Sequence, residues 1–178
     1  MVDGALGCPV CHVERVVRGG VVWWTPGVAP GASPAPDTPH DEVIRIGALI
    51  GFADAPQPFI LTGSLALAAA GLTGLAEAAL VLLDPPDDRA AAFVTVVRGA
   101  PAVPFAPKSV RGIALDGAWA TDSRRVASAV AALVPRGRLV APVETPVPPG
   151  VRELARDGRQ WVAERDADVI SLRRAPGA

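Results

Sequence analysis

Gly63 follows an apolar run, at a position where the backbone could bind a ligand. The stretch FILTGSLALAAAGLTG, residues 59–74, sets Gly63 between a strand-like run and a helix-like run. At such a junction the amides that open the helix can hold a nucleotide cofactor, and a glycine lets the ligand approach the backbone. Asp84 ends the next apolar run, ALVLLD, residues 79–84. Gly63 is therefore the first candidate for a cofactor site.

Cys8 and Cys11 form the chain's one Cys-x-x-Cys pair. A structural zinc ion needs four tetrahedral ligands. His12 is adjacent to Cys11, so the two cannot easily reach one ion, and His40 lies beyond a proline-rich stretch. We therefore expect no bound metal, with Cys8 and Cys11 as an incomplete candidate pair. A thioredoxin-like redox role is not favoured, because no strand precedes the pair.

Three carboxylates, Asp116, Asp122 and Glu144, lie at predicted strand ends, where the active cleft of an α/β sheet opens. No histidine or lysine is near enough in the sequence to pair with them, which favours turn and helix-cap roles. The sequence contains no nucleophile elbow, no His-Glu-x-x-His and no phosphate-binding loop of the Gly-x-x-x-x-Gly-Lys type. We therefore expect no catalytic residue.

Short apolar runs predict the elements that must position these residues. Residues 58–63 and 79–84 read as strands and 65–78 as the helix between them, a βαβ unit. This interpretation competes with a membrane span, since Phe59 to Leu83 carries one charge, Glu77; the three glycines within it favour the βαβ unit. Further strands are predicted at 91–99, 109–117 and 137–144, with helices at 41–54 and 123–135. Strands that alternate with helices predict a mostly parallel sheet.

The C-terminal part predicts a helix at 150–158 and two strands at 160–165 and 168–174. Little more than DAD separates the two strands, which indicates an antiparallel hairpin at the sheet edge. The fold class is therefore α/β, with five parallel strands followed by a hairpin.

Composition excludes several function classes. The 178 residues contain 17 Lys+Arg and 18 Asp+Glu, for a formal net charge of -1. This balance favours neither a nucleic-acid partner nor a polybasic membrane anchor. Two cysteines are too few for a secreted disulfide framework, and the first residues lack a signal-peptide pattern, so we expect a cytoplasmic protein.

Several landmarks occur in the order found in one family. APAVPFAPKSVRGIALDGAWA (100–120), ALVPRGRLVAP (132–142) and the closing hairpin resemble the second half of class I S-adenosylmethionine-dependent methyltransferases, over about residues 41–174. The resemblance implies a Rossmann-like sheet whose last strand is antiparallel. It also implies S-adenosylmethionine as cofactor, with Gly63 in the cofactor loop and Asp84 on the ribose hydroxyls. Asp84 is equally an ordinary turn residue before two prolines.

The same resemblance indicates a degenerate cofactor loop. Leu61 stands near the family's acidic position, and Leu65 and Leu67 replace later glycines, where their side chains would fill the cofactor space. Ala100 stands where the family carries an acid for the adenine amine, and its methyl group can neither donate nor accept. On this basis we expect no cofactor.

The N-terminal residues carry a second resemblance. CPVCHVERVVRGGVVWW, residues 8–24, resembles the latter half of a Trm112-like zinc ribbon. The proline-rich segment that follows, residues 25–40, is too rich in small residues to build a core and is expected to be an extended linker. We therefore divide the chain into a ribbon-like segment (1–24), a linker (25–40) and a Rossmann domain (41–178). Candidate anchors for a protein partner are Trp23, Trp24, Pro26, Pro30, Pro34 and Pro36.

Together these features predict a catalytically inactive, methyltransferase-like subunit that stabilises a larger protein assembly. Peripheral attachment to the cytoplasmic face of a membrane complex is left open. The alternative is an active S-adenosylmethionine-dependent methyltransferase with a divergent loop, which uses Asp84 and transfers a methyl group to an unidentified acceptor.

Overall fold

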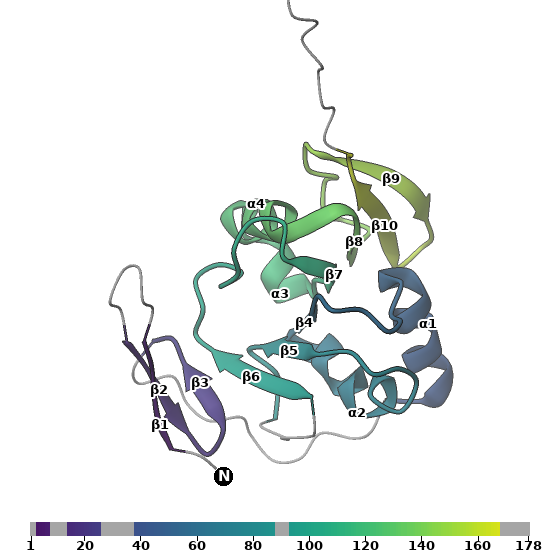
Figure 1. Ribbon diagram of the computed structural model, residues 1–178. Helices are drawn as coiled ribbons and strands as arrows, with labels where there is room; N and C mark the ends of the chain where they lie inside the picture. The colour runs from purple at the N-terminus through teal and green to yellow at the C-terminus, as the bar shows by residue number, and fades with distance from the viewer. Residues whose placement is uncertain (1–2, 8–13, 26–37, 88–92, 168–178) are drawn as a thin grey trace, which may run out of the picture.

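Six strands form the parallel part of a ten-stranded sheet in the computed structural model, which describes residues 3–7, 14–25, 38–87 and 93–167 (Figure 1). The strands are β1 (Gly4–Gly7), β2 (Glu14–Arg18), β3 (Val21–Trp23), β4 (Phe59–Thr62), β5 (Leu80–Leu83), β6 (Val94–Arg98), β7 (Val110–Ala114), β8 (Leu133–Pro142), β9 (Val151–Arg156) and β10 (Gln160–Arg165). All residues of β4 and β5 are buried, as expected of parallel strands covered on both faces.

The strand order is β1-β2-β3-β6-β5-β4-β7-β8-β10-β9. Strands β3, β6, β5, β4, β7 and β8 are parallel to their neighbours in this row. Strand β10 is antiparallel to both β8 and β9. The predicted α/β class, with a mostly parallel sheet and a C-terminal antiparallel hairpin, is therefore confirmed.

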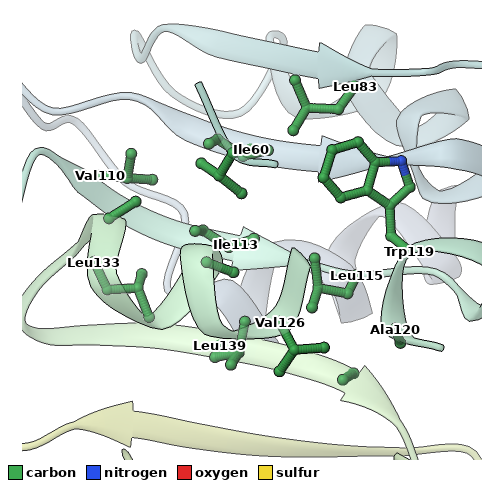
Figure 2. Packing of buried hydrophobic residues seen from close by; sticks show 14 of the residues in the cluster. Ile60, Leu83, Val110, Ile113, Leu115, Trp119, Ala120, Val126, Leu133 and Leu139 are labelled. Atoms are coloured by element: carbon green, nitrogen blue, oxygen red, sulfur yellow. The ribbon is translucent and has the colours of Figure 1, made fainter. Parts of the chain in front are cut away.

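Helices cover both faces of the sheet (Figure 1). They are α1 (His40–Ile50), the 3-10 helix η1 (Gly63–Ala68), α2 (Ala69–Leu72), α3 (Gly117–Ala120) and α4 (Ser123–Ala132). Helices α1 and α2 bury Val43, Ile46 and Leu72 in one apolar cluster with the strands. Helices α3 and α4 bury Trp119 and Val126 in a second cluster, which Figure 2 shows packed against the side chains of the sheet. The sheet therefore separates two hydrophobic cores.

A charge cluster fixes helix α1 to the turn between β9 and β10. The carboxylate of Glu42 accepts hydrogen bonds from Arg45 at 2.9 and 2.7 Å and from Arg159 at 3.3 and 3.2 Å. The hydrogen bonds from Arg45 are the largest influence on the pKa of Glu42 and lower it; burial opposes them, the hydrogen bonds from Arg159 add to them, and the pKa falls to about 2. Glu42 therefore connects two elements that lie more than a hundred residues apart in the sequence.

Two predicted helices end earlier than expected. The helix predicted at 65–78 is a 3-10 turn followed by the four residues of α2, which end at Leu72. The helix predicted at 123–135 ends at Ala132, and Leu133 already belongs to β8. In both cases the chain leaves the helix to reach the next strand of the sheet, so tertiary packing overrides the helix propensity of alanine and leucine.

The helix predicted at 150–158 is wrong, because these residues contribute strand β9. Strand β9 pairs with β10 across the turn that contains Asp157 and Gly158, where the Asp157 carboxylate accepts from the amides of Arg159 and Gln160, each at 2.7 Å. An Asp-Gly pair is a strong hairpin signal, and it outweighs the helix formers in VRELAR. The strand predicted at 168–174 lies outside the described residues.

The N-terminal strands continue the main sheet. β1, β2 and β3 form an antiparallel meander, and β3 pairs in parallel with β6. They are the β-rich appendage expected at this end, and the division at residues 24 and 40 stays a prediction. Among the described segments, none of the helices combines the length and apolar character that crossing a bilayer requires. The cytoplasmic location stays a prediction as well.

Candidate functional site

Strands β4 and β7 are neighbours, and the chain leaves their carboxyl ends toward opposite sides of the sheet. From β4 the chain proceeds through β5 to β6 on one side, and from β7 it proceeds to β8 on the other. Neighbouring strands whose connections leave in opposite directions form a topological switch point, and ligands of open α/β sheets bind outside the carboxyl ends of the strands there. Thr62 is the last residue of β4; beyond the strand ends lie Gly63 after β4, Asp84 after β5 and Asp116 after β7.

Asp116 joins the two sides of the switch point. Its Oδ1 accepts hydrogen bonds from the Trp119 amide at 3.1 Å and from the Thr62 hydroxyl at 3.2 Å. Its Oδ2 accepts from the Ser64 amide at 3.2 Å, and its own amide donates to the Thr62 hydroxyl at 2.9 Å. One carboxylate thus caps the starts of both η1 and α3, as a side-chain oxygen does for the free amides of a first turn. The sequence reasoning assigned Asp116 a cap role without its partners across the sheet.

Position 63 has room only for a glycine, because the Asp116 carboxylate occupies the space of a side chain there. The residue has φ +48°, and a Cβ there would lie 1.8 Å from Asp116 Oδ2. Leu65 packs with the cluster beneath α1 and α2, and Leu67 lines a small cavity with Leu82 and Val94. The atoms nearest to the missing Cβ therefore belong to Asp116, where the sequence had suggested leucine side chains. The amide of Ser64, at the start of η1, is engaged by a carboxylate of the chain itself.

Asp84 lies at the end of β5 in a conformation that few side chains adopt, with φ 50°. Its amide donates to the Val97 carbonyl at 2.9 Å, and its Oδ1 accepts from the Gly99 amide at 2.6 Å. Residues held at positive φ store strain and are frequent at functional sites. A carboxylate has four lone-pair positions on two oxygens, so Asp84 can accept further hydrogen bonds from a ligand while it holds Gly99.

Trp119 is a buried residue beside Asp116 that sequence reasoning did not single out. Its side chain is 1% exposed, and no described residue accepts a hydrogen bond from its Nε1. The Arg125 guanidinium lies 4.3 Å from the ring centroid, in cation–π geometry. Figure 2 shows the indole nitrogen on the side of the ring turned away from Ile60. The signal available in the sequence was the spacing of Asp116 and Trp119, which is that of an N-cap and the third residue of its helix.

The remaining candidate residues lie apart from the switch point or outside the described segments. Asp122 caps α4 by accepting from the Arg124 amide at 2.8 Å, and Glu144 is exposed beyond β8. Ala100 is fully buried in the core cluster on the side of α3 and α4. The structure does not describe Cys8, Cys11 and His12, and within the segments it does describe no group of three or more His, Cys, Asp or Glu side chains could hold a metal.

The proposed partner anchors are only partly described. Trp23 ends β3 and is half-buried, and Trp24 packs against the core cluster, with the Arg15 guanidinium 4.4 Å from its ring centroid. Pro26, Pro30, Pro34 and Pro36 lie outside the described residues. Binding of a protein partner through these residues stays a prediction.

The solved structures that this chain resembles include proteins named as methyltransferases. The antibiotic-resistance methyltransferase Kmr shares 13% identity at a TM-score of 0.46, over 78% of this chain and 98% of Kmr. The T. thermophilus 16S rRNA N2 G1207 methyltransferase RsmC, solved with AdoMet and guanosine, shares 15% at a TM-score of 0.41, over 97% of this chain and 47% of RsmC. A Bacillus halodurans C-125 protein with a provisional methyltransferase name shares 15% at a TM-score of 0.39, over 57% of this chain and 49% of that protein.

The fold is α/β, with a mostly parallel sheet and a C-terminal antiparallel hairpin, and the solved proteins that it resembles are methyltransferases by name. The matches span 49% and 47% of two of these proteins, or about half their length. No protein-family model and no curated protein matches the chain. The likeness concerns the fold alone, and it transfers no substrate to this chain.

This finding corrects three expectations. We predicted a catalytically inactive subunit, no enzyme activity and no cofactor. These three predictions are contradicted, because the solved proteins that this chain resembles carry methyltransferase names and one of them contains AdoMet. The physical reason for the error lies in the loop after β4. The leucines that replace the family's later glycines were expected to block the cofactor space. Leu65 instead packs against the core, and Leu67 lines a small cavity on the side of α2.

Proposed function

We propose that this chain is an S-adenosylmethionine-dependent methyltransferase with a divergent cofactor loop. The observation that carries the proposal is Asp84, an acidic residue at positive φ on the carboxyl end of β5, beside the switch point of the sheet. Its position agrees with the family resemblance of the sequence, in which this acid binds the ribose hydroxyls.

The residues present fit the ribose of the cofactor, but the loop after β4 differs from the family's glycine loop. The Asp84 carboxylate, oriented by the Gly99 amide, has acceptor capacity for two adjacent hydroxyls. The amide of Ser64 is bonded to Asp116, so Gly63 serves this internal contact and does not offer the open glycine cradle of the family. When bound, S-adenosylmethionine supplies a methyl group activated by its positive sulfonium. The chain's own contribution is to hold the ribose through Asp84 and to join the ends of β4 and β7 through Asp116.

Calorimetric titration of the full chain with S-adenosylmethionine and S-adenosylhomocysteine tests the proposal. We expect saturable binding that is at least about tenfold weaker in Asp84→Asn, because a hydrogen bond to a charged group contributes about 1.5–3 kcal/mol. Asparagine tolerates positive φ and its amide oxygen can still accept from Gly99, so this variant retains the local fold.

Asp41→Asn is the matched control, because it removes one carboxylate from the exposed first turn of α1. It should bind both compounds as the unaltered chain does. A flat titration of folded protein, checked by circular dichroism, would contradict the proposed function. Equal affinity of Asp84→Asn would contradict the role of Asp84.

A further inference from the structure

A groove lies between helix α4 and the segment that follows β8. Its volume is about 530 Å³. Helix α4 contributes Val126, Ala127 and Val130 to one wall, and residues 145–149 form the opposite wall. The groove is separate from the residues that surround Asp84.

The groove exists because the connection between β8 and β9 contains no helix. The two strands run parallel, since each is antiparallel to β10, and residues 143–150 join them through turns. Connections between parallel strands usually carry a helix that covers the sheet and packs beside the preceding helix. Among the described residues, that flank of α4 faces the proline-rich segment, and an apolar hollow remains.

The lining selects for an uncharged ligand. None of the described residues that line the groove carries a charge, and polar groups are limited to the hydroxyls of Thr121, Ser123 and Thr145 apart from the backbone. A charged ligand would lose hydration without gaining an ionic partner, which is strongly unfavourable. A mostly apolar ligand with one hydrogen-bonding group is complementary to these side chains.

The dimensions select for a small molecule. Pockets for small organic ligands measure about 300–1,000 Å³. The wall of α4 from Ser123 to Val130 extends about 10 Å, at about 1.5 Å per residue. A helical peptide with its side chains is about 10–12 Å in diameter, so a wall of about 10 Å would contact little more than one helix width of it. A molecule of one or two rings fits the groove.

The groove also adjoins the proposed cofactor site. Ala120, the last residue of α3, and Thr121 line the groove, and α3 is the single helical turn that Asp116 caps at the switch point. Thr145 follows the carboxyl end of β8. We propose, on the basis of the proposed function, that this groove binds the methyl acceptor and that the acceptor is an uncharged small molecule with an apolar ring body.

The experiment uses N-phenyl-1-naphthylamine, a neutral aromatic compound that fluoresces strongly in apolar surroundings. Titrated with the full chain, it should show a saturable rise in fluorescence. Ala127→Trp, which places an indole in the groove from an exposed position, should weaken this binding at least tenfold. Arg124→Trp adds the same bulk at an exposed residue of α4 outside the groove and should leave the binding unchanged.

The outcomes separate this inference from the proposed function. Ala127→Trp should still bind S-adenosylmethionine in the calorimeter, and saturating S-adenosylhomocysteine should change the dissociation constant of the probe severalfold, because the two sites adjoin. Cofactor binding without any probe binding, or equal probe binding by Ala127→Trp, would overturn the groove assignment alone. Probe binding that ignores S-adenosylhomocysteine would overturn the acceptor role. Probe binding that is lost as the protein sediments as a dimer would assign the groove to a second copy.

Discussion

At the residue scale, the contact between Gly63 and Asp116 determines the shape of the candidate site. The two residues lie 53 positions apart in the chain, and their contact depends on β4 and β7 being neighbours. The sequence indicates that Gly63 begins a helix and that Asp116 caps one. It does not indicate that one carboxylate does both, because strand order is a property of the whole sheet.

Gly63→Ala should destabilise the protein by more than about 2 kcal/mol, because alanine is strained at positive φ and its Cβ would overlap Oδ2 of Asp116. Asp116→Ala should cost about 1–3 kcal/mol through the loss of two caps. In the double variant the overlap is gone, so the combined loss measured by urea denaturation should be at least about 1 kcal/mol smaller than the sum. Strictly additive losses would show that the two residues do not interact.

At the element scale, charged side chains tie strands and helices together at their ends. Glu42 holds α1 to the β9–β10 turn, and Arg165 reaches from β10 to the last carbonyls of α4. Both contacts link residues that are remote in the sequence, so neither could be predicted from local patterns.

The Glu42 cluster predicts a pH dependence. The folded-state pKa of Glu42 is about 2, below its ordinary value of 4.5, so the unfolded chain binds the proton more readily within this range. The stabilisation is therefore fully present above about pH 4.5 and is lost as the pH falls toward 2, on the order of 2 kcal/mol in all. Glu42→Gln should flatten the acid limb of the stability curve measured by urea denaturation, whereas Asp41→Asn should preserve it. An unchanged acid limb in Glu42→Gln would contradict the role of this cluster.

Arg165 predicts a second element-level effect. Its Nη1 donates to the carbonyls of Val130 at 3.0 Å and Ala131 at 2.7 Å, and to that of Leu133. Arg165→Met keeps the apolar stem but leaves these carbonyls without their donor, so thermal unfolding should reveal a loss of about 1–3 kcal/mol. Arg152→Met on neighbouring β9, where the exposed guanidinium is 3.4 Å from Glu164, should cost less than about 1 kcal/mol. Equal losses in the two variants would argue against the capping role.

The elements themselves were predictable to the extent that local patterns determine them. The buried strands β4 and β5 and the start of α4 at Asp122 follow from apolar runs and cap residues. The helix prediction for residues 150–158 was wrong, since the helix formers of VRELAR pair as a strand beside β10. Edge strands with alternating charged and apolar residues resemble surface helices when only composition is considered.

At the scale of the whole molecule, the order of the strands places Asp84, Gly63 and Asp116 along one edge of the sheet. The sequence predicted the fold class from the alternation of strands and helices. It could not predict that β3 would add to β6, because β2, β3 and the rest of the sheet interact through backbone hydrogen bonds that leave no residue-specific signal.

Ligand binding should stabilise the whole fold if the proposed function holds. At a concentration one hundred times its dissociation constant, S-adenosylmethionine should add about 2.7 kcal/mol, which corresponds to a rise in Tm of about 5–10 °C for a chain of this size. Differential scanning fluorimetry can measure this rise, and at the same ligand concentration it should be smaller in Asp84→Asn. An unaltered Tm at millimolar cofactor would count against the proposed function.

The two ends of the ten-stranded sheet differ, and the difference limits how copies of this protein can associate. Strand β9 is exposed and carries Arg152, Glu153 and Arg156, and charged edge strands resist pairing with another strand. Strand β1, at the opposite end, consists of Gly4–Gly7 and carries no charge. Polymerisation through strand addition needs two receptive edges on each molecule. Of the two terminal strands that the structure describes, only β1 is uncharged, so we expect any edge-to-edge association to stop at a pair of copies.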